Sequence, residues 1–152
     1  MTPRRLFRAL ALTEVVTWTL LLLGMVLEHG TGTTDLLVRV GGGLHGFAFL
    51  AYAATVVLLA VDARWSAGRT LLGLVSAVVP YATVPFERST ERAGLLPEHW
   101  RLAGEPTASG PVERLVAGGL RRPVLAGVVV LAMLAVVFTG LLAAGPPTRW
   151  GS

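Results

Sequence analysis

The first apolar run, Ala9–Leu27, reads ALALTEVVTWTLLLLGMVL and is interrupted only by Glu14 and three threonines. Its length approaches the roughly 20 residues that a helix needs to cross a bilayer. Three arginines, at positions 4, 5 and 8, precede it. A secretory signal has a shorter apolar region and a small-residue cleavage site. We therefore interpret this run as an uncleaved, membrane-spanning first helix.

The whole chain has the composition of a membrane protein. Of its 152 residues, 53% are hydrophobic and only 14% are charged, whereas about 25% are charged in soluble domains. All 13 basic residues are arginines, and they flank the apolar runs. This placement favours contact with a membrane surface and excludes nucleic acid as a partner. The lack of cysteine excludes disulfides and thiolate chemistry.

Three further apolar runs follow the first. They cover about 36 (or 41) to 61, 70–86 and 123–144. The run at 70–86 contains Pro80 and Pro85. We predict an all-α membrane protein with a three-helix transmembrane core and a fourth, C-terminal transmembrane helix. The predicted organisation is a membrane domain at 1–90, a polar loop at 91–122 with a short interfacial helix, the fourth helix at 123–144 and a tail at 145–152.

The arginines also bear on the topology. A basic N-terminus predicts a cytoplasmic start in the plasma membrane of a bacterium, with several passes. Four spans would place six arginines inside and seven outside, whereas a re-entrant 70–86 segment would place eleven inside and two outside. The charge rule therefore favours the re-entrant arrangement and hydropathy favours four spans, which we take as the main hypothesis.

Polar and small residues recur at helical spacing within the first three runs. The candidate polar site consists of Glu14, His45, Tyr52, Ser76, Thr83 and Glu87. The residues expected at helix contacts are Gly42, Gly46, Gly73, Ala77 and Pro80. A rise of about 1.5 Å per residue predicts two layers. Glu14 lies with Tyr52 and Ser76 in the lower layer, and His45 lies with Thr83 and Glu87 in the upper one.

Glu14 is the most informative residue of the chain. A carboxyl group in hydrocarbon faces a bundle interior or water, because its burial costs free energy. It carries a proton or a cation, or else it makes a structural hydrogen bond to Tyr52 or to a backbone carbonyl. His45 is a proton relay, a metal ligand or a donor between helices. We expect no metal and no cofactor, because no spacing matches a metal motif.

Three short segments in order resemble the small bacterial integral membrane family with a His-Gly motif, the YdzA-like domain of unknown function. They are TEVVTW (13–18), GGLHGF (42–47) and PYATVPFE (80–87). The resemblance covers about the first 90 residues and implies a three-helix core in the plasma membrane. The motif positions that it implies are Glu14, His45, Gly46 and Pro80. The residues around Glu87 differ from those of the family pattern, so the resemblance implies no role for Glu87.

The sequence contains no P-loop, no H-E-x-x-H and no G-x-S-x-G pattern. Our first hypothesis is a non-enzymatic accessory or oligomeric interaction module, in contact with lipid and with a second copy or a membrane protein partner. The alternative is a proton- or ion-coupled carrier component that uses Glu14 and His45. A membrane enzyme with these two residues as acid and base is a third reading, against which their estimated separation argues.

Overall fold

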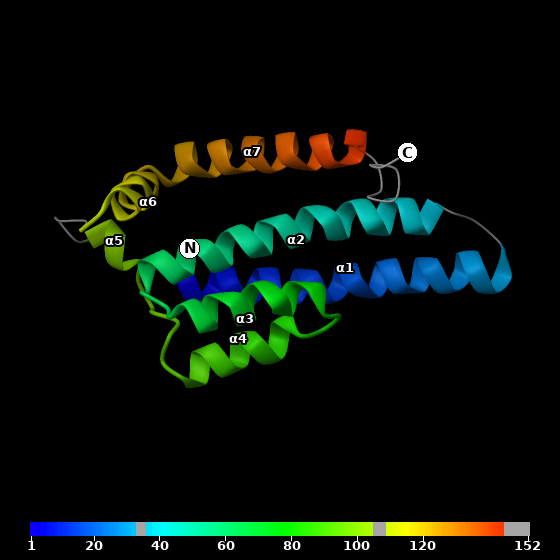
Figure 1. The fold of residues 1–152 in the computed structure, drawn as a ribbon, viewed down its shortest axis with the longest axis horizontal. Coiled ribbons are helices and arrows are strands. Elements are labelled where there is room, and N and C mark those ends of the chain that lie inside the picture. The colour runs from blue at the N-terminus through cyan, green and yellow to red at the C-terminus, as the bar shows by residue number, and fades with distance from the viewer. Residues whose placement is uncertain (33–35, 105–108, 145–152) are drawn as a thin grey trace.

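The structure is a computed structural model that describes residues 1–32, 36–104 and 109–144. In chain order its helices are α1 (Pro3–Thr31), α2 (Leu36–Asp62), α3 (Ala67–Val78), α4 (Thr83–Arg92), α5 (Arg101–Gly104), α6 (Pro111–Arg121) and α7 (Pro123–Ala144). Figure 1 shows α1 and α2 as a long antiparallel pair, with α3 and α4 on one side and α7 on the other. The all-α membrane architecture is confirmed, and the predicted tail at 145–152 lies outside the described residues.

The first helix has clear start and stop signals. The Thr2 hydroxyl accepts a hydrogen bond from the backbone N–H of Arg5 at 3.3 Å, and Pro3 occupies the first turn, as is common at helix starts. The helix ends at Gly32, whose φ of +65° glycine adopts without steric cost. Its 29 residues rise about 43 Å, more than the roughly 30 Å of a hydrocarbon core. Together α1, α2 and α7 are long and apolar enough to cross a membrane.

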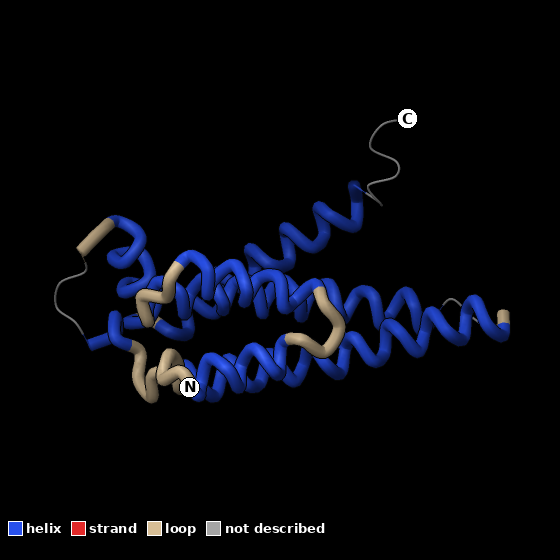
Figure 2. Tube along the Cα trace, turned by 60° about the horizontal axis from the view of Figure 1, so that its bottom comes forward, coloured by secondary structure: helices blue, strands red, loops and turns tan. Residues whose placement is uncertain are grey.

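The predicted continuous span over 70–86 is wrong. The segment is a helical hairpin in which α3 ends at Val78 and α4 begins at Thr83, and Figure 2 shows the turn beside the middle of the long helices. The 12 residues of α3 rise only about 18 Å, too little to cross a bilayer. Pro80 cannot continue a helix, and Tyr81 has a φ of +66°, which reverses the chain.

Side chains of α1 contact the turn of this hairpin. The Trp18 indole N–H donates to the backbone carbonyl of Ala77 at 3.4 Å, and the Thr19 hydroxyl lies 3.4 Å from the Tyr81 hydroxyl. Non-helical backbone is tolerated at membrane depth only where protein or water satisfies its polar groups. These contacts help α1 to support a chain reversal inside the membrane.

An aromatic cluster fills the half of the bundle that the hairpin covers. Phe7 of α1 is fully buried and stacks on Tyr52 of α2 with ring centroids 5.3 Å apart. Trp65 and Phe86 pack edge-on against the Phe7 ring, with ring centroids 6.0 and 6.2 Å from that of Phe7. Gly73 lets α3 approach closely, because a Cβ atom there would lie 2.9 Å from Val56 and 3.0 Å from Phe86. The core therefore lies at the N-terminal end of α1 and the C-terminal end of α2.

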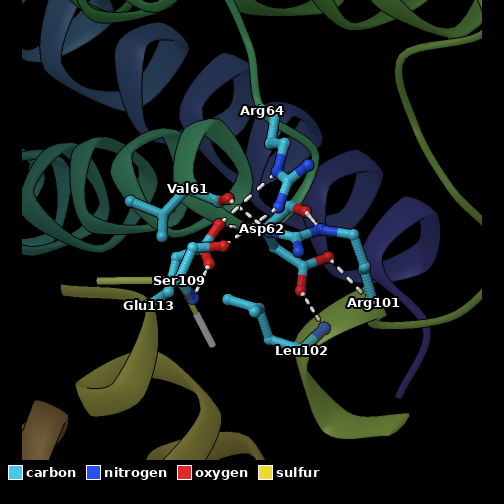
Figure 3. Close-up of polar contacts among 7 residues, drawn as sticks. All are labelled: Val61, Asp62, Arg64, Arg101, Leu102, Ser109 and Glu113. Atoms are coloured by element: carbon cyan, nitrogen blue, oxygen red, sulfur yellow. Dashed lines mark hydrogen bonds and ion pairs between the residues drawn. The ribbon is translucent and has the colours of Figure 1, made fainter. Parts of the chain in front are cut away.

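The polar segment after α4 is fixed to the end of α2 by a buried carboxylate (Figure 3). Asp62 accepts hydrogen bonds from the backbone N–H groups of Arg101 at 3.2 Å and Leu102 at 2.9 Å. The Arg101 guanidinium in turn donates to the backbone carbonyl of Asp62 at 2.6 Å and to the Glu113 carboxylate at 2.8 Å. Hydrogen bonds from the Ser109 backbone N–H and from Arg101 lower the pKa of Glu113 to about 2.

The hairpin also decides the topology. Because α3 and α4 return the chain to the end where α1 starts, the loop after α4 and the start of α7 lie at that same end (Figure 1). Among the described residues three helices are long and apolar enough to cross, and eleven of the 13 arginines fall on this side by sequence. The exceptions are Arg39 and Arg149, the latter outside the described residues. The charge pattern, and not the four-span hydropathy reading, agrees with the fold.

Candidate functional site

Glu14 and His45 meet inside the helix bundle. The Glu14 side chain is 0% exposed, and its Oε2 lies 3.4 Å from Nδ1 of His45, which is 12% exposed. The two-layer prediction, which separated these residues, is therefore wrong. It assumed that α1 and α2 start and end at the same level, whereas the end of α2 projects beyond the start of α1 (Figure 1). The offset brings His45 down to the level of Glu14.

Thr17 links the backbone of α1 to the imidazole ring of His45. Its hydroxyl donates to the backbone carbonyl of Glu14 at 3.1 Å, and it also lies 3.3 Å from Nδ1 of His45. Since a hydroxyl has one hydrogen, Nδ1–H is the donor in the second contact when the carbonyl receives the hydroxyl hydrogen. Nδ1 of the ring faces both Thr17 and Glu14.

Neither carboxylate oxygen of Glu14 accepts a hydrogen bond from the residues that the structure describes. The structural alternative, a hydrogen bond from Tyr52, is therefore not observed. Tyr52 bonds instead to Ser76, with 3.0 Å between the two hydroxyl oxygens. The Ser76 hydroxyl donates to the Gly73 carbonyl at 2.7 Å, so Tyr52 is the donor in this pair. The predicted layer of Tyr52 and Ser76 is present, but without a bond to Glu14.

Trp18 closes the site on the side of His45. The indole and imidazole rings pack with centroids 4.2 Å apart, and Phe49 lies beyond the imidazole at 6.4 Å. An indole face favours a cation above it, so this packing is compatible with a protonated imidazole as well as a neutral one. The sequence prediction placed Trp18 within the first helix but gave it no role.

Thr83 and Glu87 lie below Glu14 and not beside His45, which corrects their predicted placement. The Thr83 hydroxyl donates to the Ala11 backbone carbonyl at 3.0 Å, one turn before Glu14. The Glu87 carboxylate lies 3.4 Å from Nε of Arg8, one turn lower still. The prediction treated 70–86 as one rising helix, whereas the turn at Pro80 makes α4 descend again.

Arg4, Arg8 and Glu91 extend this row to the surface and were missed by the sequence analysis. Arg4 pairs with Glu91, and Arg8 lies 3.3 Å from the same carboxylate. The spacing of Arg4 and Arg8, and of Glu87 and Glu91, places each pair on one helix face. This spacing is visible in the sequence. The sequence alone does not show that the two faces pair, because their contact depends on the hairpin of α3 and α4.

The predicted packing residues act in different contacts. Gly46 approaches Phe138 of α7, where a Cβ atom would lie at 3.0 Å, and Gly42 faces Leu21 at 3.7 Å. Ala77 is fully buried at the end of α3. The closest approach of α1 to α2 occurs instead at Gly24 and Gly41. Among the described residues, no three His, Asp or Glu side chains gather as a metal site would require.

Comparison with known proteins agrees with this architecture. A protein of Streptomyces coelicolor named "Putative membrane protein SCO5905" is 43% identical over 95 residues, which are 62% of this chain and 11% of the relative. The chain thus spans only a small part of that protein. No solved structure matches. The sequence model of a family described as "Domain of unknown function (DUF3817)" matches residues 4–92, the part that forms α1 to α4. The expected resemblance to a small membrane family of unknown function is confirmed, and the chain belongs to the DUF3817 family.

Proposed function

We propose that the chain is a non-enzymatic accessory module of a larger membrane assembly. The observation that carries this proposal is the relative in which the matched stretch makes up 11% of the protein. There, a domain of this kind is joined to a much longer chain. The exposed helices fit such a role, since none of the apolar window of α7 is buried. Lipid, a second copy or a partner membrane protein covers these surfaces.

The proposed setting is the plasma membrane of a bacterium, with the N-terminus in the cytoplasm. The support is the excess of arginine at the end of the bundle that holds the N-terminus. The closed polar site supports a non-enzymatic role. Glu14 and His45 are close enough for acid–base chemistry, but Glu14 is 0% exposed and Trp18 packs on the imidazole. A substrate therefore has no access to the carboxyl group.

Native mass spectrometry tests the accessory role. The protein is purified in nanodiscs with lipids of its own membrane, and the masses of the released complexes are recorded. We expect a fixed stoichiometry with a membrane protein or with further copies, unchanged in Glu14→Gln. A monomer that carries only lipid, at every protein concentration tested, contradicts the proposal.

We propose as a second candidate that the module is a proton-binding component of an ion-coupled carrier. The observation that favours it is the contact of Glu14 with His45 in the bundle interior. A buried carboxylate without hydrogen bonds costs several kcal/mol, and a bound proton removes that cost. Intramembrane carboxyl and imidazole groups are the usual sites of proton relays.

Infrared difference spectroscopy tests this second candidate. The carbonyl band of a protonated carboxylic acid is separate from the carboxylate bands, so a titration of the reconstituted protein records Glu14 directly. We expect a titrating carboxylic acid band that is lost in Glu14→Gln. Glu28→Gln is the matched control, because Glu28 lies on the same helix near its far end. An identical titration in Glu14→Gln and the native protein rules the proton site out.

A further inference from the structure

A row of polar groups joins the Glu14–His45 pair to one face of the membrane. Below Glu14 come the Tyr52 side chain, at the level of Phe7, and its partner Ser76, whose hydroxyl lies 3.0 Å from that of Tyr52. The Thr83 hydroxyl follows on α4. All of these side chains are nearly or fully buried. The row thus lies in the protein interior and not against lipid.

The lower end of the row reaches water through a set of ion pairs. Glu87 is almost fully buried and lies 3.4 Å from Nε of Arg8, which is half exposed. Glu91 pairs with Arg4 and Arg8, and Arg4 also contacts the exposed Glu98 at 3.0 Å. Successive pairs along α1 and α4 are one turn apart, about 5.4 Å. Titratable groups therefore lead stepwise from the surface toward Glu14.

The opposite side of the pair is closed by backbone. A Cβ atom at Gly24 would lie 2.8 Å from the carbonyl carbon of Leu37, and one at Gly41 would lie 3.1 Å from the nitrogen of Leu21. The two helix backbones approach so closely there that a methyl group at Gly24 would overlap α2. The segments 15–27 of α1 and 40–44 of α2 contain no ionisable residue. The Thr19 and Tyr81 hydroxyls lie beyond the pair at the hairpin turn, and past that turn these two segments offer no ionisable group toward the far end.

We propose that the Glu14–His45 pair exchanges protons with only one side of the membrane, the side that holds the N-terminus and the arginine-rich loop. This inference rests on the second candidate function, proton binding at the pair. The proton enters from water at the Arg4–Glu91 level and passes Glu87 and Tyr52. A carboxylate and a neutral imidazole together carry one negative charge, so one added proton makes the pair neutral. A second added proton converts His45 to an imidazolium that faces Trp18.

The charged surroundings of the pair come from each helix packed around it. α1 contributes Arg8 below Glu14, α2 contributes His45 and Tyr52, and α4 contributes Glu87 and Glu91. On α3 the described charged side chain is Arg69 at its start, which lies over the Phe86 ring at 5.6 Å, far from the pair in sequence and level. On the other side of the pair, Tyr81 lies at the hairpin turn with its hydroxyl 3.4 Å from that of Thr19. The charged side chains nearest the pair thus lie toward the N-terminal side.

Trp18 offers a direct optical readout of His45. An imidazolium quenches the emission of an indole in contact with it, and the two rings are 4.2 Å apart. Single-orientation vesicles are required. The chain has no cysteine, so Ser109→Cys introduces one thiol on the N-terminal side, and an impermeant biotin reagent captures vesicles with that side outward. Vesicles of phosphatidylcholine and phosphatidylglycerol, with a strongly buffered interior, then receive an external pH jump.

We expect acidification outside the captured vesicles to quench Trp18 emission at once, and acidification outside the uncaptured ones to leave it unchanged. Trp18→Phe gives the background of the other tryptophans. His45→Gln should lose the quenching, whereas His29→Gln, on the exposed end of α1, should keep it. Tyr52→Phe and Glu87→Gln should slow the response without changing its final extent.

The possible outcomes separate the inference from the function on which it rests. Quenching by acid on the far side, or equally from both sides, overturns one-sided access while proton binding stands. No quenching from either side, together with no Glu14 band in the infrared titration, refutes the proton site itself. No quenching from either side with the band present also overturns the inference, because the proton then never reaches His45. An unchanged rate in Tyr52→Phe and Glu87→Gln overturns the proposed route.

Discussion

The contact of α1 with α2 at Gly24 makes a sharp prediction about Gly24→Ala. The added Cβ atom would lie 2.8 Å from the carbonyl carbon of Leu37 and 2.8 Å from the nitrogen of Val38. Both are backbone atoms, so no side-chain rotation relieves the overlap. Carbon contacts are normally about 3.5–4.0 Å, so the helices must separate by roughly 0.7 Å or more, which costs about 1–3 kcal/mol.

Gly30→Ala is the matched control for this substitution. Gly30 lies on the same helix, and a Cβ atom there meets nothing within 4 Å. Alanine is favoured over glycine within a helix by up to about 1 kcal/mol at both positions. The difference between the two variants therefore isolates the overlap with α2.

Unfolding of both variants in mixed micelles, followed by circular dichroism, measures the difference. We expect Gly30→Ala to be as stable as the native protein or slightly more so, and Gly24→Ala to be about 1–3 kcal/mol less stable than Gly30→Ala. Equal stability of the two alanine variants refutes the reasoning, because it shows that α1 and α2 are not in backbone contact at this level.

Three further predictions concern the end of the bundle that holds the N-terminus. Phe7→Ala removes a fully buried ring that contacts three others, and the same unfolding assay should show a loss of about 3–5 kcal/mol. Asp62→Ala leaves the backbone N–H groups of Arg101 and Leu102 without their acceptor, at a cost of about 1–3 kcal/mol, and limited proteolysis should then cut the loop faster. The pKa of Glu113 is lowered to about 2, so its stabilising effect is complete at neutral pH, where the carboxylate is charged. That effect should decline as the pH falls from about 4.5 toward 2. Proteolysis by an acid-tolerant protease should detect this release in the native protein but no such step in Glu113→Gln.

Hydropathy and charge predicted the elements that depend on local composition. The run that begins at Ala9 and the run at 123–144 are helices long enough to cross, and the loop expected to hold a short helix contains α6 (Pro111–Arg121). The arginine count also favoured the arrangement in which 70–86 does not cross, which agrees with the hairpin. It was outweighed by the apolar character of 70–86, because hydropathy measures whether a segment prefers lipid and not whether it crosses.

The candidate site was only partly predictable, for two physical reasons. The left-handed φ of Tyr81 is set by the turn as a whole, so Pro80 alone predicted a kink and not a reversal. The offset between α1 and α2 depends on where Gly24 and Gly41 allow the helices to interlock. Helical spacing predicts which residues share a helix face. It does not predict the height along the helix axes at which the faces of two helices pack. The contact of Glu14 with His45 depends on that level.

The hairpin that stops halfway gives the molecule a different cross-section in the two leaflets. At the N-terminal side four packed segments, α1 to α4, displace lipid together with α7, whereas only α1, α2 and α7 continue to the far side. The molecule is therefore a wedge, and it claims more area in one monolayer than in the other. Lipids around it must compensate by tilting or by bending the sheet. A cluster of such chains would then favour a membrane that is convex on the N-terminal face.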